Sequence, residues 1–373
     1  MYTISSITIF ISLFLAFYLF TVKTKIKVSN YLFSIFLILT AIDTSGIIFD
    51  KLASKPYNLI IFRSTFSFLQ IPTLYLYIKS VCYSDFKLKP KHLVHCIPFA
   101  IGNLLYMPRF YLVETADKIS FLKQHKYMFE IQLNHIIFHM QFVCYIIGIF
   151  MMLRKIKKIY LENYSGVSVK TYDWLFQFIA TLSFLYTIAL LKNIIKFSQF
   201  SAISSHFKIG IHLILFLLIC WYLYKALNNP ELFKQINSTL KPIKESILPE
   251  GLNNEIPQYE QENIEKLKNH MKNHRPFLNP SLTIQNVSDD IGIPVKELSI
   301  LINHKLNQHF YDFVNSYRIN YAKNLLSDAT QKKRTVLEIL YDSGFNSKSS
   351  FNTAFKKETG TTPTSYRKMF TIS

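Results

Sequence analysis

The sequence predicts an all-α protein in which a bundle of seven transmembrane helices precedes a domain of shorter, soluble helices. Only 17% of the residues are charged and 50% are hydrophobic, whereas soluble proteins carry about 25% charged residues. Long apolar windows fill the first part of the chain, and the C-terminal quarter has the mixed pattern of amphipathic helices. This composition argues against a wholly soluble enzyme and against a disordered, collagenous or disulfide-rich chain.

The transmembrane region is predicted to cover residues 1–227. A helix needs about 20 mostly apolar residues to cross a bilayer core about 30 Å thick. Lysines follow the first apolar window and do not precede it, so we interpret it as a retained span and not as a signal peptide. The seven windows are Ile4 to Val22, Leu32 to Phe49, Leu59 to Val81, Leu93 to Leu112, Ile131 to Leu153, Trp174 to Ile195 and Ile209 to Leu227.

Basic residues are concentrated in the same region. Residues 1–227 hold 23 Lys and Arg against 8 Asp and Glu, a net charge of +15, whereas residues 228–373 hold 19 against 15, a net charge of +4. This charge lies between apolar windows, so it is not by itself a nucleic-acid footprint. With the N-terminus outside, the inner loops carry 12 basic residues and the outer loops and helix edges carry 9. The positive-inside rule therefore predicts a multi-pass protein with an outer N-terminus and a cytoplasmic C-terminal domain.

Ionisable residues inside membrane spans are costly and mark functional sites by default. At about 1.5 Å per residue, Asp43 lies about 9 Å and Arg63 about 6 Å from the outer ends of their spans, which allows an ion pair. His135 and His139 lie one turn apart in the outer half of the fifth window, and His212 lies at a similar depth. We expect these five residues to line a signal pocket open to the outside. The alternative is that such groups only hydrogen-bond neighbouring helices to one another.

This predicted pocket lacks the patterns of common catalytic and metal sites. His135 and His139 supply only two ligands, and no Glu follows His135 to complete an HExxH motif. The chain contains no GxSxG pattern, and its four cysteines are far apart, without CxxC or zinc spacing. We therefore expect no catalytic residue, no metal and no cofactor.

Prolines and asparagines mark residues 228–257 as a linker between two domains. A helical pattern follows over residues 258–275, with Ile264, Leu267 and Met271 on one face. This connecting amphipathic helix either couples the two domains, mediates pairing between chains or packs on its own domain.

The C-terminal domain, residues 276–373, contains the pattern of short helix, turn and longer helix twice. In the first copy a helix over Ile284–Ile291 is followed by Gly292, which suits a turn of positive φ, and then by a helix that Pro294 opens and that runs through Leu306. Between the two copies, apolar residues of Phe310–Leu325 fall on one helical face. This linker helix is expected to hold the two helix-turn-helix units at a fixed separation.

The second copy carries clear helix-end signals. Thr335 and Glu338 form a capping box over a helix that ends near Tyr341. Gly344 is expected in the turn, and Ser347 caps a helix that ends at Gly360.

The residues of this second unit carry a family resemblance. Gly344 to Asn352 read GFNSKSSFN, Ala354 to Lys357 read AFKK, and Gly360 to Pro363 read GTTP before Tyr366 and Arg367. Over about residues 280–369 the chain resembles the AraC family of bacterial transcription regulators. The whole arrangement is similar to membrane-tethered regulators in which a seven-helix region carries an AraC-type domain. The resemblance implies that the second helix of each unit enters a major groove of double-stranded DNA, and that the protein lies in the bacterial cytoplasmic (inner) membrane.

The outward faces of these two reading helices follow from the helical period. Leu298, Leu301 and Ile302 are expected to face the core in the first, and Phe351, Ala354 and Phe355 in the second. Asn can pair with adenine through two hydrogen bonds, Thr can contact a thymine methyl, and Lys suits a phosphate. The alternative for these residues is a solvated helix face. The predicted DNA-binding residues are Lys296, Ser299, Ile300, Asn303, His304, Lys348, Ser349, Asn352, Thr353 and Lys356.

Two of these residues depart from the family pattern. Ile300 and Thr353 stand where the family often has an arginine, so each unit loses a guanine-reading group. This favours a site rich in A·T pairs or read partly through DNA shape. An outward Ile300 is also suited to contact a protein partner.

We therefore predict a membrane-bound, sequence-specific transcription regulator, an activator and not an enzyme, that responds to an external or membrane signal. Its expected partners are double-stranded DNA, membrane lipid, an unidentified signal ligand, a second copy of the chain as a homodimer, and RNA polymerase. The alternative is an intramembrane enzyme or transporter with an autoregulatory DNA-binding domain, which requires a catalytic constellation or broken helices near the midplane. Proteolytic release of the C-terminal domain at the linker is a further alternative.

Overall fold

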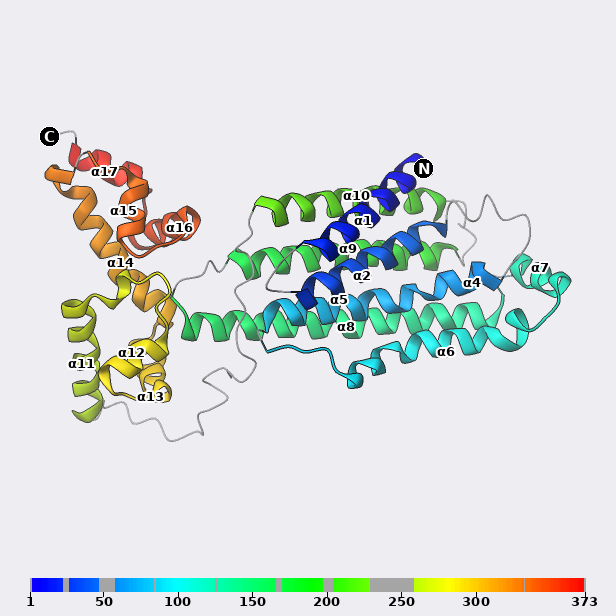
Figure 1. Cartoon of the computed structure of the whole chain (residues 1–373), viewed down its shortest axis with the longest axis horizontal. Coiled ribbons are helices and arrows are strands. Elements are labelled where there is room, and N and C mark those ends of the chain that lie inside the picture. Colours follow the sequence, from blue (N-terminus) through cyan, green and yellow to red (C-terminus); the bar gives the residue numbers. More distant parts are fainter. Residues whose placement is uncertain are drawn as a thin grey trace. The chain divides into compact units, whose positions relative to one another are not determined.

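The computed structural model is all-helical, as expected from the sequence (Figure 1). It describes residues 2–22, 27–46, 58–83, 85–124, 127–165, 170–196, 204–228, 258–331 and 333–371. Within these ranges there is no β-strand, and Tyr164 and Thr283 form an isolated bridge. The chain divides into two compact units, which are described separately. The first consists of Met1–Met152 and Trp174–Ser238, and the second of Leu153–Asp173 and Thr239–Ser373.

The first unit is built from long helices whose axes lie roughly along one common line, with α1 and α2 running in opposite directions (Figure 1). Each of the seven predicted windows is helical where it is described, although the window over Leu93–Leu112 is broken into a 3-10 turn, α6 and a π-helical turn. The helices are α1 (Tyr2–Thr21), α2 (Lys27–Thr44), α4 (Asn58–Thr65), α5 (Ser67–Cys82), α6 (Ile97–Tyr106), α7 (Thr115–Lys123), α8 (Phe129–Asn163), α9 (Lys170–Lys196) and α10 (Ser204–Asn228).

The prediction of seven spans is supported in part. Within the described residues, four helices are long and apolar enough to cross a membrane: Tyr2–Thr21, Asn58–Cys82, Phe129–Asn163 and Asp173–Ile195. A bent pair, Pro90–Tyr111 and Thr115–Lys123, makes a fifth if it is counted as one span. Prolines interrupt the backbone hydrogen bonding of a helix, and Pro98 and Pro108 lie where α6 meets the 3-10 turn before it and the π-helical turn after it. The bend of the pair falls between Tyr111 and Thr115.

Polar side chains of α2 bond to the neighbouring helices α1 and α5. Ser34 donates a hydrogen bond to the carbonyl of Ala16 on α1 at 3.1 Å, and Ser80 on α5 donates to Ser29 at 2.9 Å. Both bonds are buried. Such contacts hold helices together inside a bundle, and they explain why α2 packs closely although it does not qualify by hydropathy.

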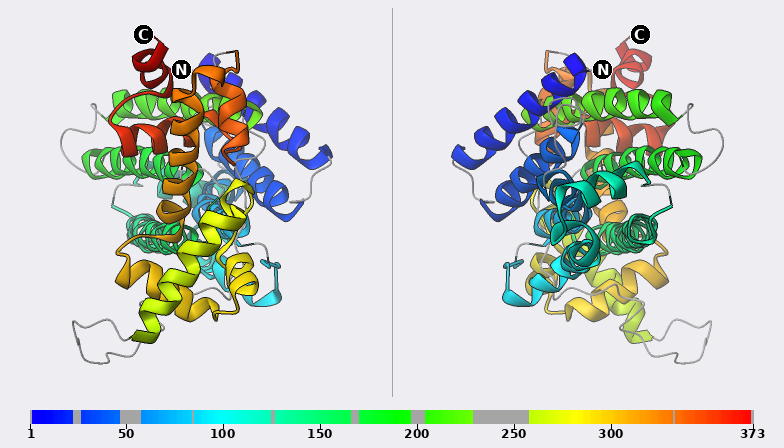
Figure 2. Two further views of the ribbon diagram at one scale, coloured as in Figure 1. Left: turned by 90° about the vertical axis from the view of Figure 1, so that its left-hand side faces the viewer. Right: turned by 90° about the vertical axis from the view of Figure 1, so that its right-hand side faces the viewer.

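The second unit contains all the helices predicted for the C-terminal domain, together with one that was not predicted, α17. Figure 2 gives two further views of these helices. Their bounds are α11 (Gln258–His274), α12 (Ile284–Ile291), α13 (Val295–Ile300), α14 (Phe310–Ser327), α15 (Val336–Asp342), α16 (Lys348–Thr359) and α17 (Pro363–Thr371). A π-helical turn, Leu301–Lys305, continues α13. The predicted linker lies outside the described residues except for Asn228.

Helix α14 contributes to two separate hydrophobic cores, as the linker helix was expected to do. Its first half places Phe310, Phe313 and Val314 in the core of the first helix-turn-helix unit. Its second half places Ile319, Ala322 and Leu326 in the core of the second. The apolar face of α11 also lies in the first core, where Leu267 and Met271 are completely buried. Of the three roles considered for α11, packing on its own domain is therefore the one observed.

Helix ends in this unit follow the predicted signals. The Thr335 hydroxyl accepts a hydrogen bond from the backbone N–H of Glu338 at 3.1 Å, and the Glu338 carboxylate accepts from the backbone N–H of Thr335. Gly344 has a φ of +81°. A Cβ at Gly344 would lie 2.4 Å from the carbonyl oxygen of Phe277, so this turn requires glycine both for its backbone angle and for the close approach of two segments.

Candidate nucleic-acid interface and signal pocket

Helix α16 presents the polar face that the sequence predicted. Its N-cap residue Ser347 accepts a hydrogen bond from the backbone N–H of Ser350 at 3.1 Å. Phe351 and Phe355 are completely buried in the second core. The helix is therefore fixed in rotation, which leaves the side chains of Lys348, Asn352, Thr353 and Lys356 exposed and that of Ser349 half-buried.

The exposed side of α16 is a shallow basic hollow of about 760 Å³. Three of its lining residues are lysines and none is acidic, so its charge suits phosphate groups. The hollow is lined by Lys348, Ser349, Asn352, Thr353, Lys356, Lys357 and Thr362. Lys357 and Thr362 were not among the predicted residues. Lys357 is one residue beyond the predicted face and forms an ion pair with Asp312 at 2.6 Å.

The first reading helix differs from the prediction at three positions. Ser299 is buried, with 1% of its surface exposed, so the expectation that it faces outward is wrong. The reason is that Asn303 folds over it: the Asn303 amide donates to the carbonyl of Ser299 at 2.9 Å and to its hydroxyl at 3.3 Å. Asn303 is half-buried and also bonds to His309 at 3.0 Å. Ile300 is half-buried, whereas Lys296 and His304 are exposed as expected.

A buried arginine on α14 was missed by the sequence reasoning. Only 1% of Arg318 is exposed. Its Nε donates to the carbonyl of Phe277 at 2.6 Å and its Nη2 to the carbonyl of Asn279 at 2.8 Å. Nη1 donates to the carbonyl of Ser165 at 2.7 Å. Burial lowers the pKa of Arg318 to about 10, and backbone carbonyls supply the hydrogen bonds that a buried cation requires.

The end of helix α8 forms part of this second unit. Ile156 and Ile159 are completely buried, and Tyr160 is 1% exposed. After the helix, the backbone N–H and the hydroxyl of Ser165 both donate to the carbonyl of Leu282, at 3.2 and 2.7 Å. The sequence did carry a signal for this contact, because the apolar spacing of these three α8 residues continues beyond the predicted span end at Leu153.

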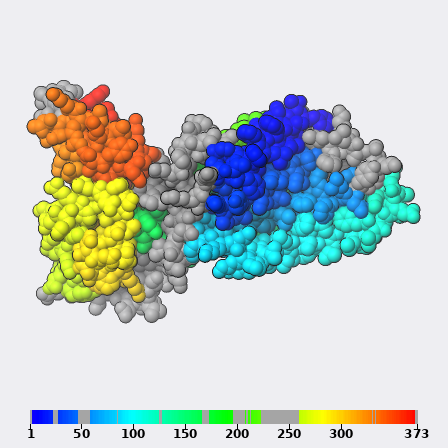
Figure 3. All heavy atoms as spheres, in the orientation of Figure 1, coloured from blue at the N-terminus to red at the C-terminus, as the bar shows by residue number. Residues whose placement is uncertain are grey.

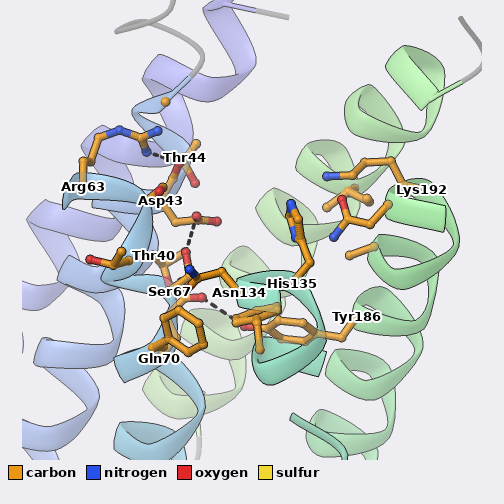
Figure 4. Close-up of a pocket in the computed structure, with 18 of the residues that line it drawn as sticks. Thr40, Asp43, Thr44, Arg63, Ser67, Gln70, Asn134, His135, Tyr186 and Lys192 are labelled. Atoms are coloured by element: carbon orange, nitrogen blue, oxygen red, sulfur yellow. Dashed lines mark hydrogen bonds between the residues drawn. The ribbon is translucent and has the colours of Figure 1, made fainter. Parts of the chain in front are cut away.

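The first unit contains a pocket of about 640 Å³, where three of the five predicted signal residues meet (Figure 4). Asp43, Arg63 and His135 line it, from α2, α4 and α8. His139 is not in the lining but bonds to Asn193, which is, at 3.1 Å. The side chain of His212 lies outside the described residues.

The ion pair considered for Asp43 and Arg63 is replaced by another contact. Nη1 of Arg63 donates to the backbone carbonyls of Ile42 at 3.0 Å and Asp43 at 3.1 Å. These carbonyls lie in the last turn of α2. Carbonyl groups there have no N–H partner within the helix, and the helix end carries a partial negative charge. The Asp43 carboxylate instead accepts a hydrogen bond from Ser67 at 2.8 Å. The matching depths of the two residues correctly predicted that Arg63 contacts this end of α2. They did not predict that it bonds to backbone carbonyls and not to the Asp43 carboxylate.

A layer of neutral polar groups lies next to these charges. Tyr186 donates its hydroxyl hydrogen to Gln70 at 3.1 Å, and Gln70 donates to Thr40 at 3.2 Å. Figure 4 shows Asp43 and Ser67 on one side of the pocket and Lys192 on the other, with His135 between them. Within the described part of the chain, no group of three or more His, Cys, Asp and Glu is placed to hold a metal ion.

The comparisons with known proteins concern the C-terminal domain. Residues 287–369 match the family described as "Helix-turn-helix domain". An uncharacterized HTH-type transcriptional regulator of Staphylococcus aureus (strain COL) is 34% identical over 86 residues, which are 23% of this chain and 11% of that regulator. A solved structure of a protein of unknown function from Listeria innocua is 31% identical and covers 28% of this chain and 95% of that one, with a TM-score of 0.25. The C-terminal region is thus a helix-turn-helix domain of the AraC type, which supports DNA binding and transcription regulation.

Proposed function

We propose that this protein is a membrane-bound transcription regulator. A signal received by the first unit changes either its binding to DNA or its effect on transcription from the bound site. The observation that carries the proposal is the exposed basic hollow on α16. Helix α16 holds the position of a reading helix in a helix-turn-helix domain. Reading helices place such residues in the major groove, where Asn and Lys contact bases and phosphates. Activation is the expected direction of regulation.

Membrane attachment is supported by the surface of the first unit. Large apolar side chains remain exposed on its helices, among them Phe10 and Phe17 on α1 and Met140 and Met151 on α8, each with between 64 and 69% of its surface exposed. Figure 3 shows α1, in dark blue, at the surface of this unit. Water-soluble proteins rarely expose so many large apolar groups together, whereas lipid-facing helices must do so.

Helix α8 offers a covalent route for the signal. Its first residues line the pocket, at Ile131, Asn134 and His135, and its last turns belong to the second unit. The end of α8 is bonded to the residues just before α12 and to Arg318 on α14. A change in the pocket that moves α8 would therefore act on the contacts of the DNA-binding domain without any further component.

The proposal is tested by mapping where a tagged full-length chain sits on the chromosome. We expect discrete sites enriched above bulk DNA. We also expect DNA fragments that carry these sites to migrate more slowly in a gel when the full-length protein in lipid nanodiscs is added. Uniform recovery of bulk DNA would overturn the proposal. Reporter fusions address the membrane arrangement: a fusion at Lys123 should be extracytoplasmic and one at Lys157 cytoplasmic, and the reverse pattern would reject the proposed topology.

A further inference from the structure

A basic segment, residues 86–96, connects α5 to α6 in the first unit. It ends in the 3-10 turn Pro90–Cys96 and runs along the edge of this unit in Figure 1. From position 79 to position 97 the chain holds four lysines and one acidic residue, Asp85. In the proposed topology this segment lies on the cytoplasmic side, between the third and fourth predicted windows.

Histidine rings hold one side of the basic segment against the bundle. The His92 ring stacks on that of Phe86, with 5.5 Å between the ring centroids. Its Nδ1 accepts a hydrogen bond from the backbone N–H of Lys89 at 3.0 Å. The His95 ring bonds to the hydroxyl of Tyr145 on α8. Both histidines are half-buried, so they attach the segment to the bundle and leave its other side chains free to face outward.

Three lysines of the basic segment are exposed, and none of them forms an ion pair with a residue that the structure describes. They are Lys87, Lys89 and Lys91. A fourth lysine, Lys79 on α5, lies over the ring of Tyr75 at 5.8 Å, and that ring is 5.8 Å from the ring of His95. Like charges that gather in this way favour the approach of an anion.

Large aliphatic side chains are exposed beside these lysines. Leu88, Leu93 and Val94 have 58, 69 and 56% of their surface exposed. A segment that carries both kinds of side chain suits the boundary of a bilayer, where aliphatic groups enter the acyl region and lysines reach the headgroups. The exposed aliphatic groups therefore favour a lipid over a nucleic acid as the source of the anion.

We propose, on the basis of the membrane-bound function proposed above, that the basic segment binds the headgroup of an anionic phospholipid. The lysines pair with the headgroup charge, and the aliphatic side chains enter the acyl boundary. Since Nδ1 of His92 accepts a hydrogen bond, the neutral ring carries its hydrogen on Nε2, which is a further donor for a phosphate oxygen. A zwitterionic lipid is a weaker ligand because its own cation offsets the phosphate.

The test compares two lipids on the purified full-length protein in detergent by native mass spectrometry. The probes are phosphatidylglycerol and phosphatidylcholine with identical acyl chains, so that only the headgroup differs. We expect phosphatidylglycerol to bind at least about tenfold more tightly, because each lysine near an anionic surface contributes a factor of about five. Equal binding of the two lipids to the wild-type protein would overturn the assignment, and this comparison does not depend on the folding of a variant.

Paired substitutions then locate the site. Lys89→Gln combined with Lys91→Gln should lower the preference for phosphatidylglycerol at least about tenfold. The matched control is Lys118→Gln combined with Lys123→Gln on α7, which removes the same charge away from the basic segment and should keep the wild-type preference. If both double variants kept it, the lipid would bind elsewhere and the assignment would be wrong.

Duplex DNA is the competing source of phosphate groups. Random-sequence DNA added to the wild-type protein should leave the binding of phosphatidylglycerol unchanged, because the basic segment is expected to contact lipid only. Displacement of the lipid by DNA would show that these lysines serve a nucleic acid, and would overturn the assignment.

This outcome is separate from that of the proposed function. If the protein shows no preference between the two lipids while the tagged chain occupies discrete chromosomal sites, only the lipid site is wrong. If the preference is found while no chromosomal site is enriched, the lipid site stands and the regulatory role fails.

Discussion

Arg318 and Ser165 share two hydrogen bonds although 153 positions separate them in the sequence. Nη1 of Arg318 donates to the Ser165 carbonyl at 2.7 Å, and Nη2 donates to its hydroxyl at 3.2 Å. Ser165 is 2% exposed and in turn donates to the carbonyl of Leu282, next to the Thr283 cap of α12. The residues that follow α8 are therefore built into the first helix-turn-helix unit.

Replacing Ser165 with Ala should loosen this contact. The change removes the hydroxyl bond to Leu282 and one of the bonds from Arg318, and a hydrogen bond contributes about 1 kcal/mol net, or about 1.5–3 kcal/mol when one partner is charged. Hydrogen exchange of the full-length protein should report about tenfold or greater loss of protection over the last turn of α8, since about 1.4 kcal/mol is a factor of ten.

Ser316→Ala is the matched control for this change. Its hydroxyl bonds only to the carbonyl of Phe313 in its own helix, at 2.8 Å, so protection in α8 should be unaffected. The affinity of Ser165→Ala for DNA should also be unchanged, because Ser165 does not line the hollow on α16. Equal protection of α8 in the two variants would show that Ser165 does not hold this helix end.

Two of the exposed residues of α16, Lys356 and Asn352, should affect DNA binding in different ways. Lys356→Ala should weaken binding to all sequences and lower the salt slope by about 1, as expected when one phosphate contact is lost. Asn352→Ala should cost about 1–3 kcal/mol at the preferred site and relax the preference at one base pair. Fluorescence anisotropy of the full-length protein with labelled operator and scrambled DNA measures both effects.

Lys268→Ala, on the exposed side of α11, controls for the loss of one positive charge. It should leave the affinity and the salt slope close to the wild-type values, because α11 packs on the first core with its other side. If Lys356→Ala behaved like this control, α16 would not be the helix that faces the DNA.

The C-terminal helices were predictable because their signals are local. A capping residue, a glycine of positive φ and two or three apolar residues on one face specify each helix within about ten residues of sequence. Gly292 has the predicted positive φ, and Gly344, predicted to lie in a turn, also has a positive φ. Helix α16 begins after its predicted cap, Ser347. The same local reasoning missed α17, because we predicted no helix after the one that ends at Gly360. Pro363 is the first residue of α17.

The errors concern side-chain contacts that neither the helical period nor the depth along a span specifies. The helical period placed Ser299 outside, but the side chain of Asn303 covers it. Span depth brought Asp43 and Arg63 together, but could not tell that Arg63 would bond to backbone carbonyls in place of the carboxylate. The contact of Ser165 with Arg318 lies beyond any local pattern, and only the continued apolar spacing of α8 hinted at it.

Gly344→Ala should be much more harmful than Gly292→Ala. Both glycines have positive φ, at +81° and +68°, so both alanine variants bear the cost of a left-handed backbone, about 1–2 kcal/mol. Around Gly292 there is open space, whereas a Cβ at Gly344 would lie 2.4 Å from the carbonyl oxygen of Phe277. This overlap should add about 1–3 kcal/mol.

The comparison of these two variants isolates the close approach from the backbone angle. Local stability is measured by hydrogen exchange in the full-length protein, over α15 and α16 for Gly344→Ala and over α12 and α13 for Gly292→Ala. Equal losses in both variants would mean that the segment around Phe277 can move away, and that the turn needs glycine only for its φ.

The capping box of α15 should make the second helix-turn-helix unit sensitive to acid. The backbone N–H and then the hydroxyl of Thr335 donate to the Glu338 carboxylate and hold its pKa below its ordinary value of 4.5. Because the pKa is lowered in the folded state, this stabilisation is fully present above pH 4.5 and is lost as the pH falls through the folded pKa. The side chain of Glu338→Gln carries no titratable group at this position, so the melting temperature of this variant should change less than that of the wild type between neutral pH and the acid side of this range.

Melting curves recorded by circular dichroism at a series of pH values test this difference. Glu265→Gln, at an exposed position of α11, is the control that should follow the wild type. A pH profile of Glu338→Gln that coincides with both would show that the carboxylate charge contributes nothing to this helix end.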